Sequence, residues 1–228
     1  MNYIVIPAYQ PDNKLIKLIE KIHEKSDFHI LVIDDGSSSE CQKIFDKAKQ
    51  FATVIRHQAN QGKGQALKTA FTYIQEQNIY GTVVTADADG QHKVWDIFRT
   101  ANKASENPNK LILGVRAFSG KVPLRSRFGN SLTKALFKLQ TGVGVTDTQT
   151  GLRAFTTNLI PFMLKIEGQR YEYEMNMLLE ATKEYEILEV PIETVYINDN
   201  EASHFRPIQD GLMIYKNIFK FALSSLSS

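Results

Sequence analysis

Two aspartates one residue apart, Asp87 and Asp89, follow an apolar, β-branched run at residues 82–85. A run of this composition is typical of a buried strand, so both carboxylates are expected at a strand end. Neighbouring carboxylates repel each other and are costly to desolvate unless a cation lies between them. We predict that Asp87, Asp89 and the amide oxygen of Gln91 bind Mg²⁺ or Mn²⁺. The alternative is a solvated turn whose aspartates cap a helix.

A cation held by so few protein groups usually completes its coordination with a diphosphate. The leaving group of a nucleotide-activated substrate is such a ligand, because the cation stabilises the charge that develops on it. Asp89 is therefore also a predicted catalytic residue. His92, beside the same loop, is a candidate contact to the donor.

Two further polar clusters flank other predicted elements. Asp34 and Asp35 end an apolar run at residues 29–33, where a carboxylate can accept an N–H of a nucleobase, hold a ribose hydroxyl, or cap a turn. Gly62 allows close approach of the backbone to a ligand, and Lys63 faces either a phosphate or solvent. Both clusters are candidate nucleotide-binding segments.

The elements that must position these residues alternate along the first half of the chain. Apolar runs predict strands near residues 3–6, 29–33, 53–55 and 81–85. Helical periodicity fills the intervals between them. This rhythm is typical of a parallel sheet covered by helices on both faces, and such sheets bind ligands beyond the carboxyl ends of their strands. The polar clusters lie at those ends, so they are expected to form one crevice.

The second half of the chain is less regular. We expect a strand at 111–114, a Gly- and Thr-rich loop at 142–155, and two short strands that Pro191 separates within 186–197. The predicted fold class is α/β: a single domain with a mostly parallel central sheet flanked by helices.

The bulk composition narrows the class of protein. A net charge of +2 argues against a general nucleic-acid coat, and the single cysteine, Cys41, excludes an internal disulfide. No apolar run reaches the roughly 18 residues that a membrane span needs. No signal peptide is visible at the N-terminus. We therefore expect a cytoplasmic protein without a nucleic-acid partner.

Five motifs occur along the chain in the order VIPAYQ, LVIDDGSSS, NQGKGQALKTAF, ADADGQH and TDTQTGLRAF. Through these motifs, residues 2–215 resemble a family 2 glycosyltransferase with the Rossmann-like GT-A fold. The branch it resembles includes dolichyl-phosphate mannose synthase and bacterial polyprenyl-phosphate sugar transferases. The resemblance implies one domain over 1–228, with a nucleotide-sugar-binding half (1–115), an acceptor-binding half (116–210) and a C-terminal helix (211–228).

The resemblance also implies roles for individual residues around the donor. The nucleotide is expected to be bound by Pro7, Ala8, Tyr9, Asp34, Asp35, Gly62, Lys63, Asp87 and Ala88. Asp34 corresponds to the aspartate that recognises the base, with Asp35 beside it. The metal ligands of the family correspond to Asp87, Asp89 and Gln91.

On the acceptor side, the resemblance implies that Arg116 binds the acceptor phosphate together with Arg125 or Arg127, and that these arginines act in catalysis. The segment that closes over donor and acceptor corresponds to Asp147, Thr150, Gly151 and Arg153. Mannose synthases carry a diphosphate-binding basic residue near a position where this chain has His204 and Arg206. This departure argues against mannose and GDP, and the resemblance to the bacterial branch implies a UDP-sugar as donor, with GDP-mannose as the alternative.

The expected reaction moves a sugar, with inversion, from a nucleotide-sugar to a polyprenyl phosphate such as undecaprenyl phosphate. It would serve cell-envelope glycan synthesis or protein glycosylation. A phosphate monoester is already anionic, so positioning and charge neutralisation suffice. A hydroxyl acceptor would instead need a carboxylate base, for which Asp147 and Glu172 are the candidates. The alternatives are a family 2 enzyme with a soluble or polysaccharide acceptor, a nucleotidyltransferase, and an inactive nucleotide-binding subunit.

The C-terminal segment 211–228 is apolar on most sides, and Lys216 and Lys220 share one face. An interfacial helix on anionic lipid, packing on the core, and contact with a small membrane-protein partner all agree with this pattern. Because a lipid acceptor requires membrane contact, we expect a peripheral protein at the inner face of the cell membrane. The sequence does not predict the oligomeric state.

Overall fold

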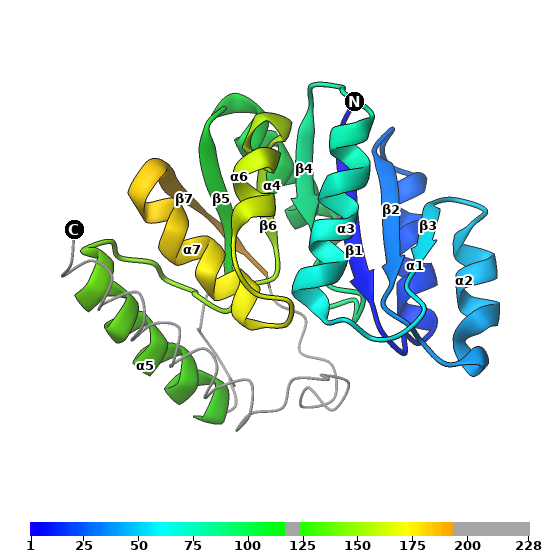
Figure 1. Ribbon diagram of the computed structural model, residues 1–228, viewed down its shortest axis with the longest axis horizontal. Helices are drawn as coiled ribbons and strands as arrows, with labels where there is room; N and C mark the ends of the chain where they lie inside the picture. Colours follow the sequence, from blue (N-terminus) through cyan, green and yellow to red (C-terminus); the bar gives the residue numbers. More distant parts are fainter. Residues whose placement is uncertain (117–123, 194–228) are drawn as a thin grey trace.

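The computed structural model of the chain describes residues 1–116 and 124–193, without the side chains of residues 124–132 (Figure 1). Its strands are β1 (Tyr3–Ala8), β2 (His29–Asp34), β3 (Thr53–Arg56), β4 (Thr82–Thr85), β5 (Lys110–Arg116), β6 (Arg153–Thr156) and β7 (Glu186–Ile192). Its α-helices are α1 (Asn13–His23), α2 (Gln42–Ala48), α3 (Lys63–Glu76), α4 (Val94–Glu106), α5 (Leu124–Thr141), α6 (Ile160–Lys165) and α7 (Glu172–Glu184).

The strands of the described residues form one sheet in the order β3-β2-β1-β4-β6-β5-β7. All neighbouring pairs are parallel except those of β6, which runs antiparallel to both β4 and β5. The prediction of a mostly parallel sheet is therefore confirmed. Since β1, β2, β4 and β5 point the same way, their carboxyl ends meet at one edge, which we call the carboxyl edge.

Both faces of the sheet are covered by helices (Figure 1). Along β1, Tyr3 and Val5 pack into one buried cluster with α3, α6 and α7, whereas Ile4 and Ile6 pack into a second cluster with α1, α2 and α4. This alternation follows from the two-residue period of a strand. Burying each large apolar side chain contributes about 1.5–3 kcal/mol, so both layers hold the sheet rigidly.

The start of α3 connects segments that are far apart in the sequence. Gly62, which precedes the helix, has φ +101°, and a Cβ there would lie 2.5 Å from the carbonyl oxygen of Gln169. Gly64 meets Tyr173 equally closely, and Gln65 donates a 2.8 Å backbone hydrogen bond to Gln169. These close approaches require glycine, and they bring α3 against the start of α7.

Two sequence predictions about the second half need correction. Residues 153–156 belong to the buried strand β6 and not to the predicted loop, since the alternation of a short buried strand is hard to recognise beside glycines and threonines. Pro191 lies within one continuous strand, β7, at a sheet edge where a missing N–H is tolerated. Helix α6 was not predicted. Residues 194–197 lie outside the described residues, as does segment 211–228.

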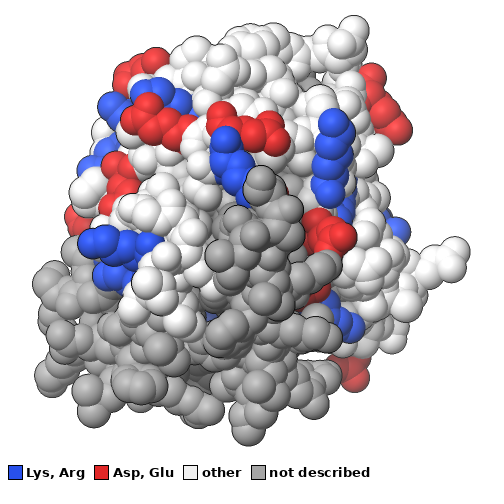
Figure 2. Space-filling model, turned by 60° about the vertical axis from the view of Figure 1, so that its left-hand side comes forward, with Lys and Arg blue, Asp and Glu red and all other residues white. Residues whose placement is uncertain are grey.

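Charged side chains of both signs are interspersed on the face shown in Figure 2, over the residues that are described. This agrees with the net charge of +2, which leaves little excess of either sign. None of the described helices combines the length and the apolar character that crossing a bilayer requires.

Candidate active site

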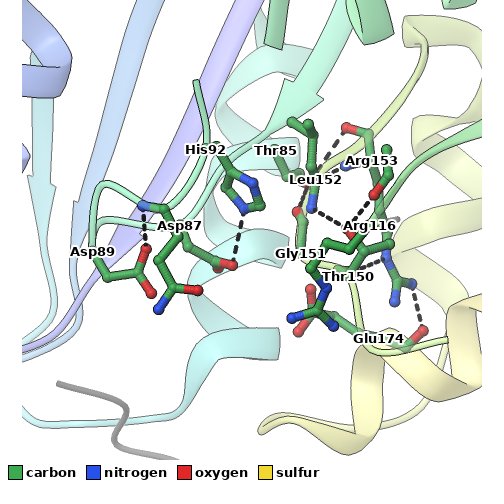
Figure 3. A network of polar contacts seen from close by, with 12 residues as sticks. Thr85, Asp87, Asp89, His92, Arg116, Thr150, Gly151, Leu152, Arg153 and Glu174 are labelled. Atoms are coloured by element: carbon green, nitrogen blue, oxygen red, sulfur yellow. Dashed lines mark hydrogen bonds and ion pairs between the residues drawn. The ribbon is translucent and has the colours of Figure 1, made fainter. Parts of the chain in front are cut away.

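The predicted residues Asp87, Arg116, Thr150 and Gly151 meet at the carboxyl edge, between β4, β5 and the loop that precedes β6 (Figure 3). The loop is fastened to both strands. Thr85 donates a 2.7 Å hydrogen bond to the carbonyl of Gly151, and Thr150 donates a 2.6 Å bond to the carbonyl of Gly114. The donor and acceptor motifs inferred from the sequence are therefore direct neighbours here.

Asp87 lies at the centre of this arrangement. Its Oδ1 is 2.7 Å from Lys63 Nζ, and its Oδ2 is 3.2 Å from His92 Nε2. Burial alone would raise the pKa of Asp87, but the ammonium of Lys63 and the hydrogen bond with His92 outweigh it and hold that pKa well below its usual range. The carboxylate is therefore ionised at neutral pH. Lys63 also contacts Glu174 on α7, with Nζ 2.9 Å from Oε2.

Asp89 is less completely engaged than Asp87. Its Oδ1 accepts a 3.0 Å hydrogen bond from the backbone N–H of Gln91. Burial and the nearby charge of Asp87 both raise the pKa of Asp89. The two carboxylates therefore repel each other in the protein without a bound cation, as expected from their spacing.

A hard divalent cation fits this donor set. The described residues contain no cluster of three or more His, Cys, Asp or Glu side chains that could hold a metal. A closed, all-protein site of the zinc type is therefore absent from the described part of the chain. Mg²⁺ and Mn²⁺ commonly bind through one or two carboxylates plus water and phosphate oxygens. Asp87 and Asp89 provide such a pair.

Gly151 allows the loop to lie directly against Asp87. A Cβ at this position would be 2.4 Å from Asp87 Oδ2, a distance that no real contact tolerates. The absence of a side chain therefore sets how closely the acceptor-side loop approaches the donor-side carboxylate.

Arg116 and Asp147 form a bidentate ion pair at the end of β5. Arg116 Nε lies 2.6 Å from Oδ2 and Nη2 lies 3.0 Å from Oδ1, and the side chain of Asp147 is fully buried. Asp147 also accepts a 3.1 Å bond from the backbone N–H of Gln149. This pair holds the guanidinium of Arg116 against the loop and commits the carboxylate to a structural contact.

The side chains of Arg153 and Glu172 are buried and hydrogen-bonded to main-chain groups of the protein. Arg153 is 1% exposed, and its Nε donates a 3.0 Å bond to the carbonyl of Thr150. Its Nη1 donates to the backbone carbonyl of Glu174, and burial lowers its pKa. Glu172 accepts bonds of 3.0 and 3.1 Å from the backbone N–H groups of Gln169 and Arg170 and so organises the start of α7. Their predicted contacts to substrate stay predictions.

The other acidic pair, at the end of β2, is fully engaged by the protein. Asp35 accepts bonds from the backbone N–H groups of Gln61 (2.9 Å) and Gly62 (2.8 Å), and its Oδ1 lies 2.8 Å from His57 Nδ1. Asp34 accepts a 2.8 Å bond from the N–H of Ser37. Both side chains are buried. In this structure they order two loops, and their predicted contacts to the nucleotide stay predictions.

The first motif packs against the loop after β2. Gln10 has φ +49°, and its backbone N–H donates a 2.9 Å bond to Ser37 Oγ. Its side-chain oxygen accepts bonds from Ser38 Oγ (3.0 Å) and the thiol of Cys41 (3.1 Å). Just before it, Pro7 and Ala8 end β1 and Tyr9 is 37% exposed at the carboxyl edge.

Several predicted residues are not described closely enough to place. Arg125 and Arg127 belong to α5, but their side chains are not described. His204 and Arg206 lie outside the described residues. Conversely, sequence reasoning missed Glu174 as the second partner of Lys63. No local pattern could have revealed this contact, because the two residues are 111 positions apart in the chain.

Comparison with known proteins agrees with this geometry. Residues 3–163 match the model of glycosyl transferase family 2. The match covers more than half of the chain. The chain therefore belongs to glycosyl transferase family 2, and it is a glycosyltransferase.

Two curated relatives and one solved structure illustrate the similarity. UDP-N-acetylglucosamine–dolichyl-phosphate N-acetylglucosaminyltransferase of Methanococcus voltae is 28% identical over 215 residues, covering 85% of each chain. Polyprenol monophosphomannose synthase of Mycolicibacterium smegmatis is 23% identical over 201 residues, covering 83% of this chain and 75% of that protein. The crystal structure of glucosyl-3-phosphoglycerate synthase from Mycobacterium tuberculosis, in complex with Mn²⁺, UDP and phosphoglyceric acid, matches with a TM-score of 0.71 at 17% identity, over 98% of this chain and 78% of that one. This likeness confirms the GT-A fold.

Proposed function

We propose that this glycosyltransferase moves a sugar from a nucleotide-sugar to a polyprenyl phosphate. The observation that carries the proposal is the contact between the donor-side carboxylate Asp87 and the acceptor-side loop at Gly151. A transferase must bring an anionic leaving group and an incoming nucleophile to one point, and the carboxyl edge has a carboxylate pair and an arginine within one cluster. A UDP-sugar is the favoured donor, with GDP-mannose as the alternative.

On the donor side, Asp87, Asp89 and the amide of Gln91 would hold Mg²⁺ or Mn²⁺. Such a cation, when bound, neutralises the charge that develops on the departing diphosphate. Pro7 to Tyr9 and the loops ordered by Asp34 and Asp35 would bind the nucleoside. The rigid backbone of these loops favours a preorganised pocket, since the hydrogen bonds of Asp35 exist before the nucleotide arrives.

On the acceptor side, Arg116, with Arg125 or Arg127, would bind the phosphate and orient one oxygen toward the anomeric carbon, on the face opposite the leaving group. Attack from that face inverts the configuration. No strong base is needed, because the phosphate is already ionised. The structure favours such an acceptor over a hydroxyl, since both carboxylates considered as bases, Asp147 and Glu172, are buried and engaged in hydrogen bonds.

The names of the relatives support the same class of substrates. The Methanococcus voltae protein is named for UDP-N-acetylglucosamine and dolichyl phosphate, and the Mycolicibacterium smegmatis protein for polyprenol phosphate. Because a lipid phosphate lies at a bilayer, we further propose that the protein works as a peripheral protein on the inner face of the cell membrane. Segment 211–228, outside the described residues, is the proposed contact to lipid or to a small membrane partner.

The decisive experiment is a panel of radiolabelled donors, UDP-N-acetylglucosamine, UDP-glucose and GDP-mannose, incubated with undecaprenyl phosphate and Mn²⁺ or Mg²⁺. We expect label in the butanol-extractable lipid and release of a nucleoside diphosphate. Label only in water-soluble or polymeric product would show that the acceptor is not a lipid. Release of pyrophosphate would indicate a nucleotidyltransferase. Product no greater than in a reaction without the protein would indicate an inactive subunit.

A further inference from the structure

The ammonium of Lys63 lies beside Asp87, where a bound divalent cation would place its positive charge. Its ammonium lies 2.7 Å from Asp87 Oδ1 and 2.9 Å from Glu174 Oε2, and its side chain is 16% exposed. Three elements therefore meet at one cation: the loop after β4, the first residue of α3, and the first turn of α7. In this state Asp87 is already neutralised without any divalent ion.

This position is imposed on Lys63 by its surroundings. A cation at the N-terminus of a helix is disfavoured by the helix dipole, and Lys63 is the first residue of α3. The turn at Gly62 packs against Gln169, and the Lys63 side chain that follows it contacts both Asp87 and Glu174. Two carboxylate oxygens lie close to the ammonium, Asp87 Oδ1 at 2.7 Å and Glu174 Oε2 at 2.9 Å, and they favour its charged form.

We propose that Lys63 is an exchangeable counter-cation. It neutralises Asp87 in the empty enzyme and moves to the donor diphosphate when the nucleotide-sugar binds, which frees Asp87 for the divalent cation. The inference rests on the proposed function, because it assumes that Asp87 and Asp89 hold the metal. A lysine suits this exchange, since its flexible stem and three donors allow one anion to replace another.

Glu174 keeps Lys63 within reach during the exchange. It is a buried residue of α7, and its Oε2 retains the ammonium when Asp87 is released. Its Oε1 has no hydrogen-bond partner among the described residues. This oxygen can therefore accept a hydrogen bond from the ammonium after Lys63 has moved. Its backbone carbonyl accepts from Arg153, which anchors this part of α7.

The exchange has a measurable consequence, a coupling between metal and nucleotide. A divalent cation alone must displace the ammonium from Asp87 and therefore binds weakly. With nucleotide present, Lys63 has another anion to contact, and the cation binds more tightly. Removing the ammonium should strengthen binding of the metal alone and weaken its dependence on nucleotide.

The test is titration of the purified protein with Mn²⁺, followed by electron paramagnetic resonance of free Mn²⁺, with and without UDP or GDP. In Lys63→Met we expect Mn²⁺ alone to bind about tenfold more tightly than in the wild type, a size common for coupling between neighbouring sites. The further gain on adding nucleotide should shrink by a similar factor. Circular dichroism verifies the fold, and Lys63→Gln replaces Lys63→Met if the latter does not fold.

Two matched variants separate charge from other effects. Lys63→Arg keeps a cation at the position, so Mn²⁺ alone should stay weakly bound. Lys68→Met removes another lysine of α3, whose Nζ lies 5.1 Å from the ring centroid of Tyr173, and should behave as wild type.

The outcomes distinguish this inference from the proposed function. If wild-type protein binds no Mn²⁺ with any nucleotide, the metal site of the proposed function is wrong and the exchange with it. If the wild type binds Mn²⁺ with nucleotide, but Lys63→Met and Lys63→Gln bind Mn²⁺ alone no more tightly, only the exchange is wrong.

Discussion

The chain has two acidic pairs at strand ends, and they differ in how many backbone N–H groups hold their carboxylates. The pair at the end of β2 accepts three main-chain N–H groups, two at Asp35 and one at Asp34, in addition to contacts with the side chains of His57 and Arg56. The carboxylate of Asp87, after β4, is held by the side chains of Lys63 and His92. Backbone partners cannot leave without unfolding a loop, whereas side-chain partners can rotate away. The first pair is therefore suited to ordering the loops around it, and the second to binding a cation or substrate.

The strongest test of this comparison is Asp89→Asn. It keeps the shape of the side chain but removes half of the charge offered to a divalent cation. We expect sugar transfer to fall about 10²–10³-fold, as when one group that stabilises the transition state is lost. Steady-state kcat with the radiolabelled donor measures the effect, and an unchanged circular dichroism spectrum verifies that the fold is intact. Activity within a few-fold of the wild type would show that Asp89 is not an active-site residue.

Asp35→Ala should damage the fold more than any change at Asp89. It leaves two backbone N–H groups and His57 without their acceptor in a buried place, which costs about 3 kcal/mol of the free energy of unfolding. Urea unfolding measures the loss. The matched control is Asp46→Ala on the surface of α2, which should leave the free energy of unfolding nearly unchanged. An Asp35→Ala protein as stable as the wild type would contradict the structural role of these hydrogen bonds and overturn the comparison.

Gly151→Ala tests the contact between the two sides of the site. The added methyl group would lie 2.4 Å from Asp87 Oδ2, so either the loop or the carboxylate must shift. We expect kcat/KM to fall about tenfold, because small misplacements of a catalytic group are costly. Gly144→Ala is the control, since a Cβ there meets nothing within 4 Å. Equal activity of the two variants would mean that the approach of the loop is irrelevant to transfer.

The smallest expected effect is a gain in stability from the same Asp89→Asn change. Burial and Asp87 raise the pKa of Asp89, so the folded protein holds this proton more tightly than the unfolded chain does. Stability is therefore lost as the pH rises from the ordinary pKa through the raised one, and the ionised group is destabilising at pH 7. Without divalent cation, Asp89→Asn should melt about 1–2 °C higher than the wild type at pH 7. The gain should vanish near pH 3. A melting temperature of Asp89→Asn below that of the wild type at pH 7 would contradict the repulsion between Asp87 and Asp89.

Much of the site could be predicted because the carboxyl ends of parallel strands lie at the same edge of a sheet. The polar residues after β2 and β4 belong to that edge by topology alone, so Asp34 and Asp87 were expected to lie near each other. Arg116 and the loop at Asp147 came from the resemblance to the family. The orientation of these side chains could not be predicted, since it depends on which donors reach them. Arg153 shows this, because its guanidinium donates to the backbone carbonyls of Thr150 in the loop and Glu174 in α7, and the latter lies far along the chain.

The sequence by itself determined the class of fold, the edge at which the site forms, and the chemical types gathered there, because periodicity and strand-end composition are local properties of the chain. Only the tertiary structure decided which carboxylates are committed and which are exchangeable. The ammonium of Lys63 between Asp87 and Glu174, and the guanidinium of Arg116 on Asp147, join residues far apart in the chain. Such pairings arise from packing α3 against α7 and the loop against β5, and no local pattern encodes them.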